Sequence, residues 1–123
     1  MKSLSSIGLL SLIFVTGWAC AQTSAPQFPC EDDARFAEFD FWVGEWDVHI
    51  ADGTLQGSNS ITSDYRSCVL VEHYETATGF VGMSVNYLDH QTGEWVQIWN
   101  DSSGSQINIR GGLTDEGMRL VGT

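Results

Sequence analysis

From residue 44 onward, apolar and polar residues alternate with a period of two, which is the pattern of β-strands that bury one face. The run WDVHI at residues 46–50 shows the alternation, and Asp52-Gly53 after it has the composition of a tight turn between antiparallel strands. We predict seven short strands, at residues 44–50, 54–62, 68–76, 80–88, 94–100, 106–110 and 118–121.

The segments between these strands are rich in the turn-forming residues Gly, Asp, Asn and Ser, and Gly111-Gly112 is one such segment. Consecutive hairpins predict an all-β, antiparallel up-and-down meander that hides its edges by closing into a barrel. The pattern stops within a strand at 120–123, whereas a small closed barrel uses about eight strands. We therefore expect a C-terminally truncated, incomplete barrel with an unpaired edge.

The first residues have the features of an export signal. Lys2 supplies the positive end, residues 7–15 (IGLLSLIFV) form a short apolar core, and residues 19–21 form an A-x-A site with cleavage expected after Ala21. The alternative is a lipoprotein that is lipidated at Cys20. Either reading predicts a periplasmic or secreted protein, and no later apolar run reaches the about 20 residues of a transmembrane helix.

Three segments follow from this reading: a signal peptide at 1–21, a linker at 22–30, and one domain at 31–123. The linker (QTSAPQFP and Cys30) is polar and contains both prolines. The segment 31–41 predicts a short helix, because acidic residues crowd its first turn and Phe36 and Phe39 lie three residues apart. We expect this helix to be a lid or plug.

Charge limits the partners of this domain. The 123 residues include 5 Lys and Arg against 16 Asp and Glu, for a net charge of −11. So few cations cannot neutralise a row of phosphates, which excludes nucleic acid as a partner. The 11% of aromatic residues is too high for a disordered acidic tail.

Cleavage after Ala21 leaves two cysteines, Cys30 and Cys68. A lone pair in an oxidising compartment is more often a disulfide than two free thiols, so we predict a Cys30–Cys68 bridge. The alternative is a pair of unpaired buried thiols in a protein that stays in the cytosol.

A ten-residue block, FDFWVGEWDV at 39–48, is the most distinctive stretch of the chain. Shorter matches accompany it: Gly53, Gly57, Cys68-Val69-Leu70, Glu72, Ser84-Val85-Asn86-Tyr87, Trp95, Gln97, Trp99 and Gly117-Met118. Together these residues resemble a bacterial family of exported proteins of unknown function, the DUF1579 type. The resemblance covers about Cys30 to the last residue. It implies a calycin-like barrel related to lipocalins and nitrobindin-like barrels, and members that continue with further strands.

Gly44-x-Trp46 is also similar to the lipocalin G-x-W motif. In that motif the indole plugs one end of the barrel beneath a late basic residue. The resemblance implies that this basic partner lies beyond Thr123. The nitrobindin-type resemblance transfers no haem ligand to any position here.

Polar residues on the inward face of the strands are the candidates for a binding site. Glu72 and Tyr74 share one face of their strand, while His73 lies on the other. If the register is favourable, a carboxylate, a hydroxyl, two amides and indoles surround one cavity, which predicts a ligand site at Trp46, Glu72, Ser84, Asn86, Gln97 and Trp99. A bulge in the 89–94 turn would send the later residues to the other face. The alternative is that these aromatics and amides are core residues.

The favoured function is binding of a small, partly apolar ligand in the barrel interior. The alternative is an enzyme on the same scaffold, a cyclase, isomerase or hydrolase, in which a buried Glu72 works with Tyr74 or His73. A third class is an acidic interaction module that uses its outer face. No pattern indicates a metal or cofactor, because the three histidines are isolated and no P-loop or H-E-x-x-H motif occurs.

Overall fold

The computed structural model describes residues 27–122 as one antiparallel sheet preceded by short helical pieces. The helical pieces are α1 (Pro29–Asp32), η1 (Ala34–Ala37) and η2 (Asp40–Trp42). The strands are β1 (Gly44–His49), β2 (Leu55–Asp64), β3 (Val69–Glu75), β4 (Val81–Leu88), β5 (Trp95–Asp101), β6 (Gln106–Thr114) and β7 (Gly117–Gly122). The predicted signal peptide lies outside the described residues.

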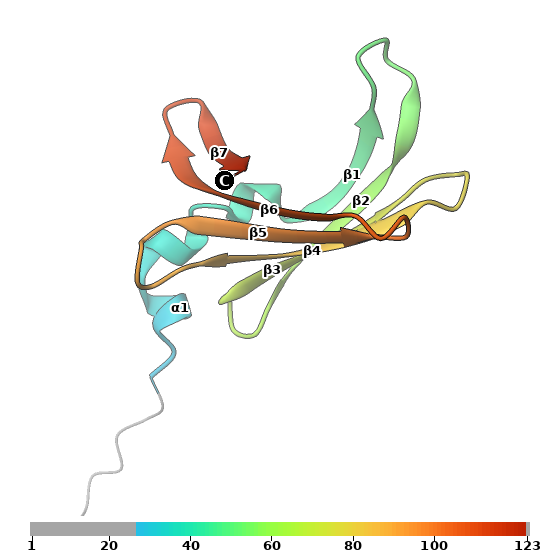
Figure 1. The fold of residues 1–123 in the computed structure, drawn as a ribbon. Coiled ribbons are helices and arrows are strands. Elements are labelled where there is room, and N and C mark those ends of the chain that lie inside the picture. The colour runs from blue at the N-terminus through green and yellow to red at the C-terminus, as the bar shows by residue number, and fades with distance from the viewer. Residues whose placement is uncertain (1–26, 123) are drawn as a thin grey trace, which may run out of the picture.

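The seven strands lie in the sheet in sequence order, and every neighbouring pair is antiparallel. The predicted all-β up-and-down meander is therefore confirmed. The sheet curls into an open half-barrel, with β1 and β2 rising on one side and β6 and β7 on the other (Figure 1). Within the described residues, β1 and β7 are the two edges of the sheet.

The strand register assigns every side chain to one of two faces. Partners that face each other across antiparallel strands point to the same side. The row Ile61, Glu72, Ser84 and Trp99 is continuous across β2 to β5, as the pairs Ile61↔Glu72, Glu72↔Ser84 and Ser84↔Trp99 show. This row belongs to the concave face of the half-barrel, against which the helical pieces pack.

The predicted helix at 31–41 is wrong in its continuity, because the segment forms three separate short pieces. Asp33 has an extended backbone (φ −96°, ψ 113°) between α1 and η1, and its carboxylate accepts from the Arg35 backbone N–H at 3.0 Å. Such a local bond competes with helix continuation. The side chain of Arg35 also donates to Asp33, which lowers the pKa of that carboxyl to about 2.

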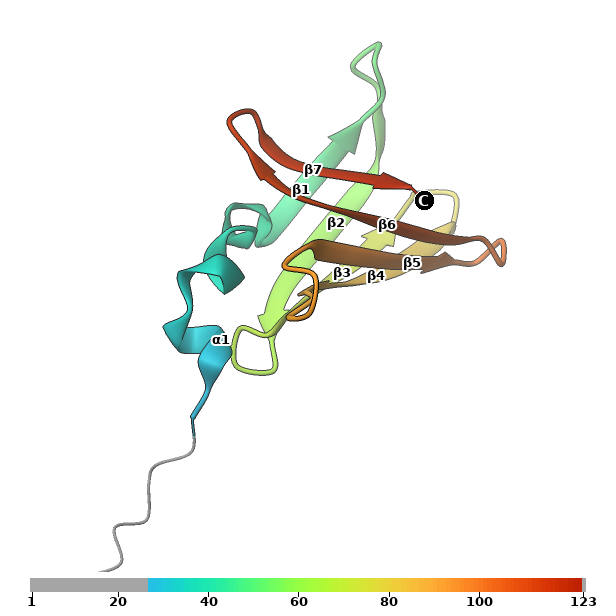
Figure 2. The ribbon, with the colours of Figure 1, turned by 60° about the vertical axis from the view of Figure 1, so that its left-hand side comes forward.

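The expectation that this segment acts as a plug agrees with its packing. Phe36 and Phe39 are buried, and the rings of Phe39 and Trp95 form a T-shaped pair with centroids 5.5 Å apart. The Trp95 indole N–H donates to Glu38 at 3.2 Å. The apolar core therefore lies at one end of the half-barrel, where the helical pieces gather (Figure 2). Its buried members are Cys30, Phe36, Phe39, Ile61, Leu70, Leu88 and Trp95.

The Gly111-Gly112 pair is not a turn, as the sequence predicted, but lies inside β6. A side chain at Gly111 would place its Cβ 2.0 Å from the Arg119 carbonyl oxygen of β7. The glycine lets the two backbones approach closely within the strand, so the composition of the pair misled the turn prediction. The turn between β6 and β7 lies at Asp115 and Glu116, within the turn-forming segment 115–117 that the sequence also predicts.

The predicted disulfide between Cys30 and Cys68 is present, with the two Cα atoms 5.0 Å apart. It joins α1 to the β2–β3 connection. Arg66 of the same connection pairs with Glu31 at 2.8 Å and lies over the Phe28 ring at 3.5 Å. A cross-link spanning 38 residues stabilises a fold by about 4 kcal/mol in the chain-entropy model. Residues at the end of the predicted linker are thus attached to the domain.

Among the described residues, no helix has both the length and the apolar character that crossing a bilayer requires.

Candidate functional site

A buried polar cluster occupies the middle of the concave face. It consists of Asn59 from β2, Glu72 from β3, Ser84 and Asn86 from β4, and Gln97 from β5. Glu72 is 7% exposed and Asn59 8%, while Ser84 and Asn86 are fully buried. Gln97 is half-buried at the same face. The structure therefore brings together four of the six predicted site residues.

Glu72 is the centre of the hydrogen-bond network of this polar cluster. Its Oε1 accepts from Asn59 Nδ2 at 2.6 Å. Its Oε2 accepts from the Ser84 hydroxyl at 2.5 Å and from Gln97 Nε2 at 3.3 Å. The carboxylate is thus held by three uncharged donors from three different strands.

Ser84 links the carboxylate to the amides. Its Oγ accepts from Asn86 Nδ2 at 2.8 Å and from Gln97 Nε2 at 3.2 Å while its hydroxyl proton goes to Glu72. A hydroxyl has one donor and two acceptor positions, so Ser84 is saturated. Asn86 Nδ2 also donates to the Leu70 carbonyl at 3.3 Å.

The two predicted tryptophans stand apart from the hydrogen-bond network. Trp46 lies on edge strand β1, is 45% exposed, and donates its indole N–H to the Trp42 carbonyl at 2.7 Å. Its position differs from the lipocalin-like plug expected from Gly44-x-Trp46, because Phe36 and Phe39 fill that end instead.

Trp99 lies across the neighbouring strand, where a Cβ on Gly82 would be 2.1 Å from its ring. The ring of Trp99 and that of Tyr74 have centroids 6.2 Å apart, so they form an aromatic pair beside the polar cluster. The Trp99 indole N–H donates to Asp101 at 2.9 Å. Hydrogen bonds from Ser103 and then from Trp99 hold the pKa of Asp101 at about 2.

Asn59 was missed by the sequence analysis. The signal was available, because Asn59 lies two residues from Ile61 on the same face of a strand that was correctly predicted. The register places it directly opposite Tyr74 on β3 and Trp46 on β1. Asn59 can donate to Glu72 because β2 and β3 pair in this register. The alternation of residues along β2 alone does not predict the register.

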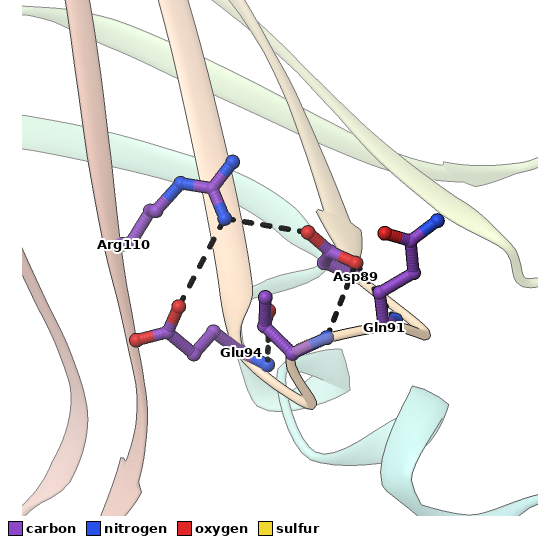
Figure 3. Close-up of polar contacts among 5 residues, drawn as sticks. Asp89, Gln91, Glu94 and Arg110 are labelled. Carbon is purple, nitrogen blue, oxygen red and sulfur yellow. Dashed lines mark hydrogen bonds and ion pairs between the residues drawn. The ribbon is translucent and has the colours of Figure 1, made fainter.

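The sequence left open the register of β4 against β5 across the 89–94 turn. In the structure this register brings the side-chain amides of Asn86 and Gln97 to the same face. The pairing is continuous from Leu88↔Trp95 to Gly82↔Asp101, so Asn86 lies opposite Gln97. Arg110 of β6 braces this turn through Asp89 at 3.3 Å and Glu94 at 3.9 Å (Figure 3).

The Asp89 carboxylate also caps the turn itself. It accepts from the backbone N–H of Gln91 at 2.8 Å and of Thr92 at 3.4 Å. These two bonds, and then the Arg110 side chain, lower the pKa of Asp89. The Arg110 ion pairs lie on the convex face, because Arg110 is paired with Val96. They hold the turn and are not part of the polar cluster.

The network offers Glu72 no titratable hydrogen-bond partner. Its three donors are two amides and a hydroxyl. His73 is exposed and lies on the opposite face of β3, opposite Met83. Tyr74 shares the concave face with Glu72, but among the hydrogen bonds of the described residues none joins their side chains. Charge and hydrogen bonds can hold a ligand in such an arrangement, whereas acid–base catalysis generally employs a pair of titratable groups.

The convex face is hollowed next to His73. One hollow of about 380 Å³ is lined in part by Glu45, Ser60, His73 and Glu75. In the part of the chain that the structure describes, no three His, Cys, Asp or Glu side chains are arranged to hold a metal ion.

No family model, curated protein or solved structure matches this chain. The resemblance to the DUF1579-type family therefore stays a prediction that rests on the residues quoted for it.

Proposed function

We propose that this protein is an exported, lipocalin-like carrier or sensor that binds a small, partly apolar molecule on the concave face of its half-barrel. The observation that carries the proposal is the polar cluster around Glu72. Burying a carboxylate in a sheet interior costs free energy, which three hydrogen bonds to uncharged donors offset only in part. In a binding site, the buried carboxylate and its amides would bind and orient the polar end of a ligand.

The surroundings of the polar cluster support the same function. On one side lie the apolar core residues Leu70 and Leu88, and on the other lies the aromatic pair of Tyr74 and Trp99. Tyr74, Gln97 and Trp99 are only half-buried, so the concave face is accessible beside the polar cluster. A binding site with an apolar wall and a few convergent polar groups is the usual form of a small-molecule site.

Export is part of the proposal. A disulfide in a small domain is typical of an oxidising compartment, and Cys30–Cys68 is such a bond. The proposal includes cleavage after Ala21 and release into the periplasm or medium. Edman sequencing or intact mass of the exported protein tests the cleavage position, and an N-terminal lipid on Cys20 would contradict it.

Native mass spectrometry tests ligand binding directly. The full chain is incubated with a bacterial cell extract, desalted, and measured under native and denaturing conditions. We expect an added mass of a few hundred daltons in the native spectrum only, as for drug-sized ligands.

Two glutamine variants serve as a matched pair for this measurement. Gln97→Ala removes an amide of the polar cluster and should reduce the bound fraction, whereas Gln91→Ala changes an exposed residue of the 89–94 turn and should preserve it. If the wild-type chain acquires no mass from any extract, the concave face is a filled core and the proposed function is wrong.

A further inference from the structure

The unpaired atoms of the polar cluster are all hydrogen-bond acceptors. Among the buried side-chain atoms of the described residues, Asn59 Oδ1 and Asn86 Oδ1 have no hydrogen-bond partner. Both amides are fixed in orientation, because Asn59 Nδ2 meets a carboxylate and Asn86 Nδ2 meets the Leu70 carbonyl, and neither of these groups can donate. What the polar cluster lacks is therefore a donor.

The carboxylate of Glu72 has one unused acceptor position. Oε2 accepts two hydrogen bonds, whereas Oε1 accepts only the one from Asn59. A carboxylate oxygen commonly accepts two. Glu72 Oε1 and Asn59 Oδ1 are therefore two acceptors, on side chains that are bonded to each other, and each has an unused acceptor position.

The polar cluster also lacks a positive charge. In the part of the chain that the structure describes, the ion pairs are made by Arg35, Arg66 and Arg110, and none of them involves Glu72. Arg119 lies on the convex face, opposite Gly112 of β6. A buried carboxylate without a cation is the costly arrangement, and a ligand that brings the cation relieves it.

The aromatic pair of Tyr74 and Trp99 lies on the same side of Glu72 along the strands as Asn59. Tyr74 is directly opposite Asn59 in the β2–β3 ladder, and the Trp99 ring covers Gly82, which is opposite Tyr74 on β4. The faces of aromatic rings attract cations. The Trp99 N–H is already bonded to Asp101, so its ring offers only the π surface.

We propose that the ligand is a cation, an ammonium or amidinium group attached to an apolar or aromatic body. The cation binds at Glu72 Oε1 and Asn59 Oδ1, and the body lies against Tyr74 and Trp99. This inference rests on the proposed function and adds to it the charge and hydrogen-bonding class of the ligand.

A set of three probes with one ring and one chain length isolates the charge. Phenethylamine, phenethyl alcohol and hydrocinnamate are positive, neutral and negative at pH 7, and their binding to the full chain is measured by calorimetry at about 0.15 M salt. We expect the amine to bind about ten-fold or more tightly than the alcohol, and the carboxylate to bind most weakly.

Variants of two glutamates on β3 separate the site from the general charge of the protein. Glu72→Gln keeps the shape of the side chain and should reduce the preference for the amine over the alcohol to near one. Glu75→Gln removes the same charge from the exposed, convex side of the strand and should leave the preference unchanged. The ranking of the probes on the wild-type chain needs no variant, so it stands even if Glu72→Gln folds poorly.

Each contrary result has a separate meaning. If the alcohol or the carboxylate binds as tightly as the amine, or if Glu72→Gln keeps the preference, the cationic class is wrong while ligand binding stands. The same holds if native mass spectrometry finds a bound molecule without a basic nitrogen. If none of the three probes binds, the inference fails, and the extract experiment alone decides the proposed function.

Discussion

Two serines of the sheet donate hydrogen bonds of nearly equal length to glutamates, one on the concave face and one on the convex face. Ser84 donates to Glu72 at 2.5 Å on the concave face, where it is fully buried. Ser60 donates to Glu45 at 2.6 Å on the convex face, where the bond is exposed. Replacing each serine by alanine therefore compares the same bond in two environments.

The expected cost of Ser84→Ala follows from the bonds that it removes. The bond to a buried carboxylate contributes about 2 kcal/mol. Asn86 Nδ2 and Gln97 Nε2 each lose an acceptor but keep a second one at 3.3 Å. The loss of these two bonds to Ser84 should therefore cost about 1 kcal/mol in total. The free energy of unfolding should fall by about 3 kcal/mol for Ser84→Ala. For Ser60→Ala it should fall by about 0.5 kcal/mol, because water replaces the lost bond.

Urea unfolding followed by tryptophan fluorescence measures both variants. With a slope near 1.5 kcal/mol/M, the unfolding midpoint should fall by about 2 M for Ser84→Ala and by about 0.3 M for Ser60→Ala. An unchanged slope checks that the variants unfold from the same native state. If the two midpoints shift by equal amounts, Ser84 does not hold Glu72 in a buried network, and the argument for a preorganised site is refuted.

Two further predictions concern the backbone and the response to acid. Gly111→Ala should lower the unfolding midpoint far more than Gly112→Ala, because only the first Cβ would meet the Arg119 carbonyl oxygen; equal effects would contradict the close β6–β7 approach. The pKa values of Asp33 and Asp101 fall from 3.8 to about 2 on folding, so their contribution to stability is complete above pH 3.8 and is lost as the pH falls through 2. Asp101→Asn should flatten the dependence of thermal stability on pH between 4 and 2, and an unchanged slope would contradict this.

The meander could be predicted because its strands alternate apolar and polar residues, and six hydrogen-bonded strand pairs follow from consecutive hairpins. The sequence was less informative where local composition and tertiary packing disagree. Gly111 has the composition of a turn, but it lies in a strand because β7 approaches its backbone. The segment 31–41 has helical spacing, but Asp33 interrupts it through a bond to Arg35.

The polar cluster was predictable in its members on β3 and β4, because Glu72, Ser84 and Asn86 follow from alternation along strands whose limits were nearly right. The position of Gln97 depended on the conformation of the 89–94 turn, which Asp89 caps and Arg110 contacts. The direction of each amide, and hence which atoms remain unpaired, depends on contacts across strands. No period in the sequence encodes those contacts, and this is why Asn59 was missed.

The polar cluster lies on the inner strands of the sheet and not on its edges. All five of its residues come from β2, β3, β4 and β5, and each of these strands is hydrogen-bonded on both sides. Their backbone positions are therefore fixed by complete ladders, which is the condition for a preorganised site. Trp46, by contrast, lies on edge strand β1 and is the most exposed of the predicted site residues. A strand that paired with β1 or β7 would alter the walls of the half-barrel, but it would leave Glu72, its three donors and the free acceptor of Asn59 in place. The preference for a cation should thus be a property of the four inner strands themselves.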